Sequence, residues 1–208
     1  MLKIFQMEPN ERVLLKSIEL FTKYGIRLVT MDQIADEVGM SKRTIYELFK
    51  DKDTLVKFCL EEMFRMQIQE TQEILAKTSN VIEALHRMGI YREKKLASVN
   101  FLFYEDIRKL YPHLWEQMKR FAKSGADSLN RKILTKGIKE GIFKKELKVE
   151  IIDIFITSMM EIFHKKDTFP ENTSDEDLIR NIIVPYYLGI STEKGKQLIE
   201  QYLTATPS

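Results

Sequence analysis

Residues 30–52 read TMDQIADEVGMSKRTIYELFKDK, and this stretch decides the fold. Thr30 and Gln33 have the spacing of a capping box, in which each side chain satisfies the backbone amide of the other residue. Gly39 can adopt a left-handed conformation at little cost, and Ser41 is a favourable N-cap for a following helix. The stretch therefore predicts two short helices joined by a glycine turn, which is the arrangement of a DNA-binding helix-turn-helix.

Helices on both sides of this stretch are predicted to complete a small domain. Leu14, Ile18 and Phe21 have the spacing of one helix face, and Gly25 follows as a stop signal. Asp51 is expected to begin a longer helix that runs to about Ala76. The residues expected to face inward are Met31, Ile34, Ala35 and Val38 in the second helix, Ile45, Leu48 and Phe49 in the third, and Leu55, Phe58, Cys59, Met63 and Met66 in the fourth.

The rest of the chain also has helical periodicity and no sustained alternation of polar and apolar residues. Further helices are predicted near 80–95, 96–109, 112–140, 148–166 and 175–203, with the last interrupted around Pro185 and Gly189. The predicted fold class is all-α. An N-terminal three-helix domain over residues 1–52 is followed by a larger helical domain over residues 53–208.

Composition sets wide limits on function. The chain has 208 residues, of which 44% are hydrophobic, and a formal net charge of +2 that neither proposes nor excludes DNA. Cys59 is the only cysteine, so no intrachain disulfide is possible, and we expect a reducing, cytoplasmic location. The N-terminus resembles neither a signal peptide nor an anchor, and no apolar run reaches the ~18 residues of a membrane span.

The third helix carries side chains suited to a DNA groove. Arg43 has the donors for a bidentate contact with guanine, and Thr44 suits a thymine methyl group or a phosphate. Tyr46 and Lys52 are placed for phosphate contacts. The predicted DNA-binding residues are Thr30, Ser41, Lys42, Arg43, Thr44, Tyr46 and Lys52. By spacing alone, a compact three-helix unit with solvated charges remains an alternative.

The same residues resemble the TetR family of bacterial regulators. That family's pattern has Phe-x-x-x-Gly at the end of the first helix, here Phe21 to Gly25, and Ile-Ala-x-x-x-Gly in the second, here Ile34 to Gly39. A third part corresponds to Ser41, Thr44-Ile45-Tyr46, Phe49 and Lys52. Arg43 stands where many members have glycine, and Glu47 where an aromatic residue or histidine is common. The arginine indicates a base preference particular to this protein, and Glu47 is expected either to repel backbone phosphate or to read a cytosine amine.

The resemblance implies a partner, an assembly and a mode of control. The expected partner is double-stranded DNA with a roughly palindromic operator, bound by a homodimer whose recognition helices enter successive major grooves. Residues 53–208 are expected to dimerise and to bind a small-molecule effector that controls release from DNA. Most members are repressors, and no cofactor is implied.

Two sets of residues in the C-terminal part are candidates for these roles. The candidate dimer residues are Ile152, Phe155, Met159, Phe163, Leu178 and Ile182, although an intramolecular core explains the same periodicity. The candidate effector residues are Met88, Tyr91, Phe101, Tyr104, Tyr111, Trp115, Met118 and Phe121, although aromatic residues at helical spacing are more often core.

Other functions find little support in the sequence. The three histidines lack metal-ligand spacing, and no catalytic motif occurs, so neither a metal site nor an enzyme is predicted. The seven basic residues between 131 and 148 are expected to form a solvated face, with a second nucleic-acid surface as the alternative. The alternative function for the whole chain is a helical protein that binds an apolar ligand and has no role on DNA.

Overall fold

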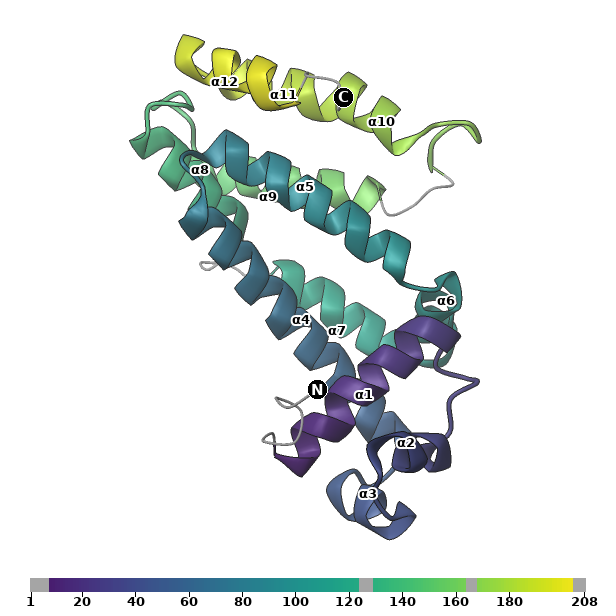
Figure 1. The fold of residues 1–208 in the computed structure, drawn as a ribbon. Helices are drawn as coiled ribbons and strands as arrows, with labels where there is room; N and C mark the ends of the chain where they lie inside the picture. Colours follow the sequence, from purple (N-terminus) through teal and green to yellow (C-terminus); the bar gives the residue numbers. More distant parts are fainter. Residues whose placement is uncertain (1–7, 124–128, 164–167, 204–208) are drawn as a thin grey trace. The chain divides into compact units, whose positions relative to one another are not determined.

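A computed structural model describes residues 8–123, 129–163 and 168–203, and these residues are mainly helical (Figure 1). They form no β-strand, and one isolated bridge joins Phe143 to Ser191. The all-α prediction is therefore confirmed. None of the helices in the described ranges is long and apolar enough to cross a membrane.

The helices follow one another closely along the chain. In order they are α1 (Pro9–Tyr24), α2 (Met31–Val38), α3 (Lys42–Leu48), α4 (Lys52–Lys77), α5 (Val81–Ser98), α6 (Phe101–Leu110), α7 (Pro112–Lys123), α8 (Leu129–Lys139), α9 (Val149–Phe163), α10 (Asp175–Leu178), the π-helix η4 (Ile179–Ile183), α11 (Val184–Ile190) and α12 (Glu193–Leu203). The four helices predicted before residue 80 are confirmed within a few residues.

The C-terminal helices differ from the prediction in their breaks. Within the range 112–140 the structure describes α7 and α8, and the predicted stretch between them, residues 124–128, lies outside the described residues. In the range 175–203 the break falls at Ser191 and Thr192, whereas Pro185 lies in the first turn of α11. Proline is tolerated there because an amide in the first turn has no partner within its own helix.

The π-helix η4 has a local cause. Pro185 has no N–H, so it cannot donate to the carbonyl of Asn181 four residues earlier. The amide of Val184 instead donates to the carbonyl of Ile179, five residues earlier. The proline thus accompanies a change of hydrogen-bond register without ending the helical path.

Contacts divide the chain into two compact units. The N-terminal unit comprises residues 1–70 and 91–119, and the C-terminal unit comprises residues 71–90 and 120–208. Both α4 and α5 therefore contribute to each unit. The ranges 1–52 and 53–208 remain a prediction about function, since compact packing divides the chain elsewhere.

The core of the N-terminal unit joins the first three helices to α4, α6 and α7. Val13, Phe21, Ile34, Ile45 and Leu55 are fully buried in it, and Phe103 and Ile107 of α6 belong to the same cluster. Three residues expected to face inward are instead exposed: Leu48, Phe58 and Met66. Leu48 lies in the last turn of α3, where Ile45 and Phe49 already occupy the buried side.

The core of the C-terminal unit is assembled from α5, α8, α9, α11 and α12. Its fully buried residues include Ile82, Leu134, Ile142, Phe143 and Ile199. Phe143 packs so closely on Gly137 of α8 that a β-carbon there would overlap its ring. This contact explains why an apolar helix face carries a glycine.

Candidate DNA-binding site

The second helix of the motif is fixed at both ends by its own sequence. The Gln33 amide donates to the Thr30 hydroxyl at 3.2 Å, and the Thr30 amide donates to the Gln33 side chain at 2.8 Å, so the predicted capping box is present. Gly39 has φ +67° and ψ +38°, the left-handed conformation that glycine adopts most easily. The Met40 amide then donates to the Ala35 carbonyl at 3.0 Å, which closes the turn.

The third helix starts from a second cap. The Thr44 amide donates to the Ser41 hydroxyl at 3.1 Å, and the two hydroxyls lie 2.8 Å apart. The Ser41 hydroxyl oxygen thus accepts a hydrogen bond from the first turn of α3 and stabilises the start of that helix. Any contact of Ser41 with DNA therefore remains a prediction beside an observed structural role.

One side of α3 is anchored and the other is open. Ile45 is fully buried, whereas Lys42, Arg43, Tyr46 and Glu47 are exposed. Since each residue turns the helix by about 100°, Arg43 and Glu47 each lie about 160° from Ile45. The pair is therefore central on the outward face.

Carboxylates already hold the exposed cations of this helix. Lys42 Nζ lies 2.8 Å from Asp32 Oδ2 of α2, and this hydrogen bond raises the pKa of Lys42. Arg43 Nε donates to Glu47 Oε1 at 2.8 Å. Exposed pairs of this kind contribute little to stability, so the cations can exchange these partners for phosphate or a base.

Lys52 lies at the start of α4 and differs from the other basic candidates. Its side chain is partly buried, and this burial lowers its pKa, while Asp106 and Asp53 act in the opposite direction. The amide of Thr54 donates to Asp51 Oδ1 at 2.7 Å, so Asp51 caps the same helix. Lys52 thus has carboxylates around it, and its phosphate contact remains a prediction.

Polar contacts fix α1 against the motif. Arg12 Nη2 donates to the Val38 carbonyl at the end of α2, at 2.9 Å. Lys16 lies 3.1 Å from Glu37 Oε2, also on α2. A charged donor on a carbonyl at a helix C-terminus also satisfies a group without an intrahelical partner.

Contacts that the sequence does not predict join α6 and its N-cap residue to the last turn of α1 and the turn that follows it. The Asn100 amide donates to the Thr22 carbonyl at 2.8 Å, and the Asn100 side chain donates to the Lys23 carbonyl at 3.1 Å. Asp106 is only 3% exposed, and its Oδ2 accepts the Arg27 amide at 2.8 Å. We call these residues, Asn100 and Asp106 with their partners Thr22, Lys23 and Arg27, the α1–α6 clasp. Asn100 has the sequence signal of a helix N-cap, but nothing in the sequence pairs it with a residue 77 positions away.

A further hydrogen bond joins Tyr111, the residue between α6 and α7, to the start of α4. The Tyr111 hydroxyl donates to Asp53 Oδ1 at 2.9 Å. Burial, with this hydrogen bond, raises the pKa of Tyr111 far above its ordinary value. Tyr111 therefore has an observed role in packing beside its predicted role in binding an effector.

The structure does not gather the candidate effector residues in one core. Tyr104, Tyr111 and Trp115 pack in the core of the N-terminal unit, and Met88 packs in that of the C-terminal unit. Phe101 is exposed and Tyr91 is half-buried. The side chains of Met118 and Phe121 lie outside the described part of the structure. The set remains a prediction.

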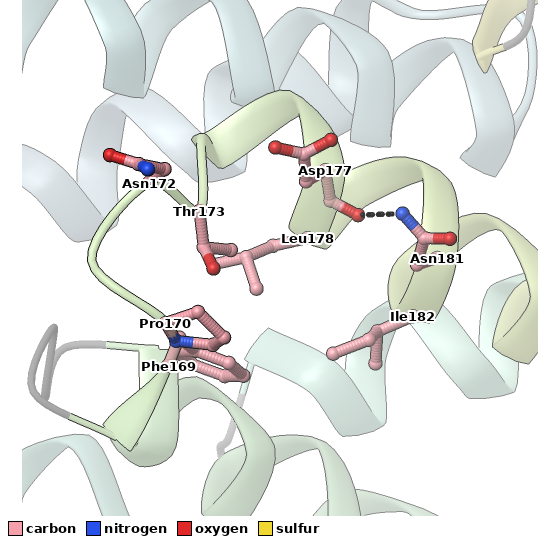
Figure 2. A pocket seen from close by; sticks show the side chains of 8 residues that line it. All are labelled: Phe169, Pro170, Asn172, Thr173, Asp177, Leu178, Asn181 and Ile182. Carbon is pink, nitrogen blue, oxygen red and sulfur yellow. Dashed lines mark hydrogen bonds between the residues drawn. The ribbon is translucent and has the colours of Figure 1, made fainter.

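The candidate dimer residues differ in exposure. Phe155 is exposed, Met159 is buried, and Ile152, Leu178 and Ile182 are half-buried. The side chain of Phe163 is outside the described part of the structure. Leu178 and Ile182 also line a hollow of about 420 Å³ in the C-terminal unit (Figure 2). Its other lining residues are Phe169, Pro170, Asn172, Thr173, Asp177 and Asn181.

Several basic residues between 131 and 148 have structural partners. Arg131 Nε lies 2.7 Å from Asp153 Oδ2, and Lys136 donates to the Leu75 carbonyl at 2.8 Å. Lys144 donates to the Gly189 carbonyl at 2.6 Å. These contacts hold helices of the C-terminal unit together, which accounts for part of the positive charge without a second nucleic-acid surface.

Comparisons with known proteins agree with this geometry. Residues 13–58 match the family model described as bacterial regulatory proteins, tetR family. The HTH-type transcriptional repressor KstR2 of Mycobacterium tuberculosis is 24% identical over 145 residues, which cover 66% of this chain and 70% of KstR2. The HTH-type transcriptional regulator YvaF of Bacillus subtilis is 27% identical over 115 residues, 55% of this chain and 60% of YvaF. The latter match thus spans less than two thirds of the relative.

A solved structure extends the likeness to the fold as a whole. A transcriptional regulator from Cytophaga hutchinsonii has a TM-score of 0.65 at 22% identity, covering 88% of this chain and 98% of that one. The fold and the site define a DNA-binding regulator of the helix-turn-helix class. Its helix-turn-helix region, residues 13–58, is similar to that of the TetR family of bacterial regulatory proteins. The relatives named here are regulators of transcription and not enzymes.

Proposed function

We propose that this protein is a sequence-specific regulator of transcription, most simply a repressor, that binds a palindromic operator as a homodimer and leaves it when a small molecule binds. The observation that carries the proposal is the helix α3, which is capped at Ser41, anchored by Ile45 and open on the opposite side. A helix held in this way can enter a major groove with its outward side chains against the bases.

The proposed homodimer has a surface available on α9. Ile151, Ile154, Phe155 and Ile162 fall on one side of this helix and are 45–65% exposed. Ile179 of η4 is also exposed, in the same compact unit. Full burial of an exposed side chain of this size contributes about 1.5–3 kcal/mol, so covering the exposed half of each of these would stabilise an interface by about 1–1.5 kcal/mol, whereas leaving it in water favours aggregation. Phe155 is the predicted dimer residue that this surface supports best.

Recognition of a palindromic operator, as proposed, requires a dimer. A single α3 covers one half-site, and two copies related by a twofold axis read a palindrome with half-sites about 34 Å apart. An effector that changes this separation lowers the affinity for the operator without touching DNA. The effector is expected in the helical region after residue 53, and its chemistry is open.

Selection of bound sequences from a random duplex pool tests the proposal. We expect the purified protein to recover a palindrome, and Arg43→Ala to lower affinity for it. Lys94→Ala, which also removes an exposed cation, is the matched control and should leave affinity unchanged. Salt-sensitive binding without sequence preference, or no binding, would contradict the proposal. Either result would favour the alternative, a helical protein that binds an apolar ligand and has no role on DNA.

A further inference from the structure

Glu47 is the one carboxylate at the centre of the outward face of α3. It lies on the same side as Arg43, about 160° around the helix from the buried Ile45. The side chains of Arg43 and Glu47 are 88% and 61% exposed, respectively. A negative charge at this position faces the DNA that the helix is proposed to enter, so its presence there calls for a chemical reason.

The guanidinium of Arg43 and the carboxylate of Glu47 form a hydrogen-bonded pair of donor and acceptor groups. Arg43 Nε donates to Glu47 Oε1 at 2.8 Å, across one helical turn. Arg43 keeps its terminal nitrogens as donors, and Glu47 keeps lone pairs as acceptors. The pair therefore presents donors and an acceptor side by side to whatever contacts this face.

The major-groove edge of a G·C pair has the complementary order. Guanine presents two acceptors, N7 and O6, and the adjoining cytosine presents the N4 amino donor. A carboxylate accepts hydrogen bonds only, so it is repelled by the acceptor edges of guanine and by thymine O4. Opposite cytosine N4 it gains a hydrogen bond, and Arg43 compensates its charge.

We propose that Glu47 is a specificity-determining residue that selects cytosine, and that Arg43 and Glu47 together read a G·C pair in each half-site. The inference rests on the proposed DNA-binding function and adds the base pair that the site prefers. Arg43 supplies attraction to guanine, and Glu47 supplies both the contact with cytosine and the rejection of guanine and thymine at its own position. The pair differs from Lys42 with Asp32, which joins α3 to α2, because both of its members lie on the outward face of α3.

The test is parallel selection from a random duplex pool with the wild type and Glu47→Gln. We expect the wild type to select G·C at one position of each half-site, and Glu47→Gln to reduce that preference about tenfold or more, because glutamine also donates to other bases. Binding to random DNA should rise when the negative charge is removed. Glu61→Gln is the matched control, since Lys57 and Glu61 form an exposed pair with the same spacing on α4.

The outcomes separate the inference from the function. If Glu47→Gln selects the wild-type site with unchanged preference at every position, Glu47 only pairs with Arg43 and the inference is wrong. If the wild type selects no sequence at all, the proposed function fails and this inference fails with it. Circular dichroism of each variant should match the wild type, because the substituted side chains are exposed.

Discussion

The α1–α6 clasp makes a prediction that can be sized from the structure. Asp106 is buried, and its carboxylate accepts the Arg27 amide at 2.8 Å. A hydrogen bond to a charged group contributes about 1.5–3 kcal/mol, and removing the acceptor also leaves the amide without its partner. The guanidinium of Arg27 is 3.5 Å from the other oxygen but largely exposed, so it adds less than about 1 kcal/mol. Asp106→Ala should therefore lower the free energy of unfolding of the N-terminal unit by about 1.5–3 kcal/mol.

Tryptophan fluorescence during urea denaturation is the assay for this change. Trp115 is the only tryptophan, and it packs against the core of the N-terminal unit. Asp106→Asn keeps an acceptor without the charge, so it should recover part of the loss. Glu105→Ala removes the neighbouring carboxylate, which pairs with the exposed Lys109 on the surface of α6, and should leave the midpoint unchanged. Equal midpoints for Asp106→Ala and Glu105→Ala would refute the reasoning.

Three more predictions concern glycine, a helix cap and alkaline pH. Gly25 has φ +86° and ψ +155°, with Leu102 Cβ 3.1 Å from where a β-carbon would lie, so Gly25→Ala should cost about 1–3 kcal/mol. Gly89 lies within α5, where a β-carbon would meet open space, so Gly89→Ala should instead raise the free energy of unfolding by about 0.5–1 kcal/mol. Urea denaturation monitored by circular dichroism measures both glycine variants. Thr30→Ala removes the N-cap of α2 and should cost about 0.5–2 kcal/mol, while Thr30→Ser should restore most of it; equal losses for both would show that the cap is not responsible. Burial raises the pKa of Tyr187 above its ordinary value of 10.0, so above that pH the unfolded chain loses a proton that the folded chain keeps, and stability falls. The free energy of unfolding, measured between pH 8 and about pH 10.5, should fall less for Tyr187→Phe than for the wild type. An equal fall in both proteins would show that other groups cause it.

The sequence was sufficient for the parts of the site that local chemistry decides. Thr30, Gly39 and Ser41 act within a few residues of themselves, and the structure has their caps and turn where the sequence predicts them. Helix faces were harder to predict. Leu48 and Phe58 are apolar and suitably spaced, yet they are exposed because neighbouring residues fill the available core.

Contacts between distant parts of the chain were not predictable in the same way. Arg27 and Asp106 are 79 residues apart, and neither belongs to a recognisable motif. The pairing exists because α6 packs on α1 within one compact unit. A single sequence shows that α6 is amphipathic, but not which helix its polar residues reach.

The single thiol of this protein, Cys59, can report how often the core of the N-terminal unit opens. Cys59 is 1% exposed among the side chains that support α1 to α3, and burial raises its pKa, so it stays protonated and shielded while the core is closed. A thiol reagent reacts only during openings, and its rate in excess reagent measures how often this core opens. The other unit has no cysteine and stays silent in that measurement. The rate of Cys59 labelling with and without operator DNA would thus show how DNA changes the opening of the N-terminal unit, separately from the rest of the protein.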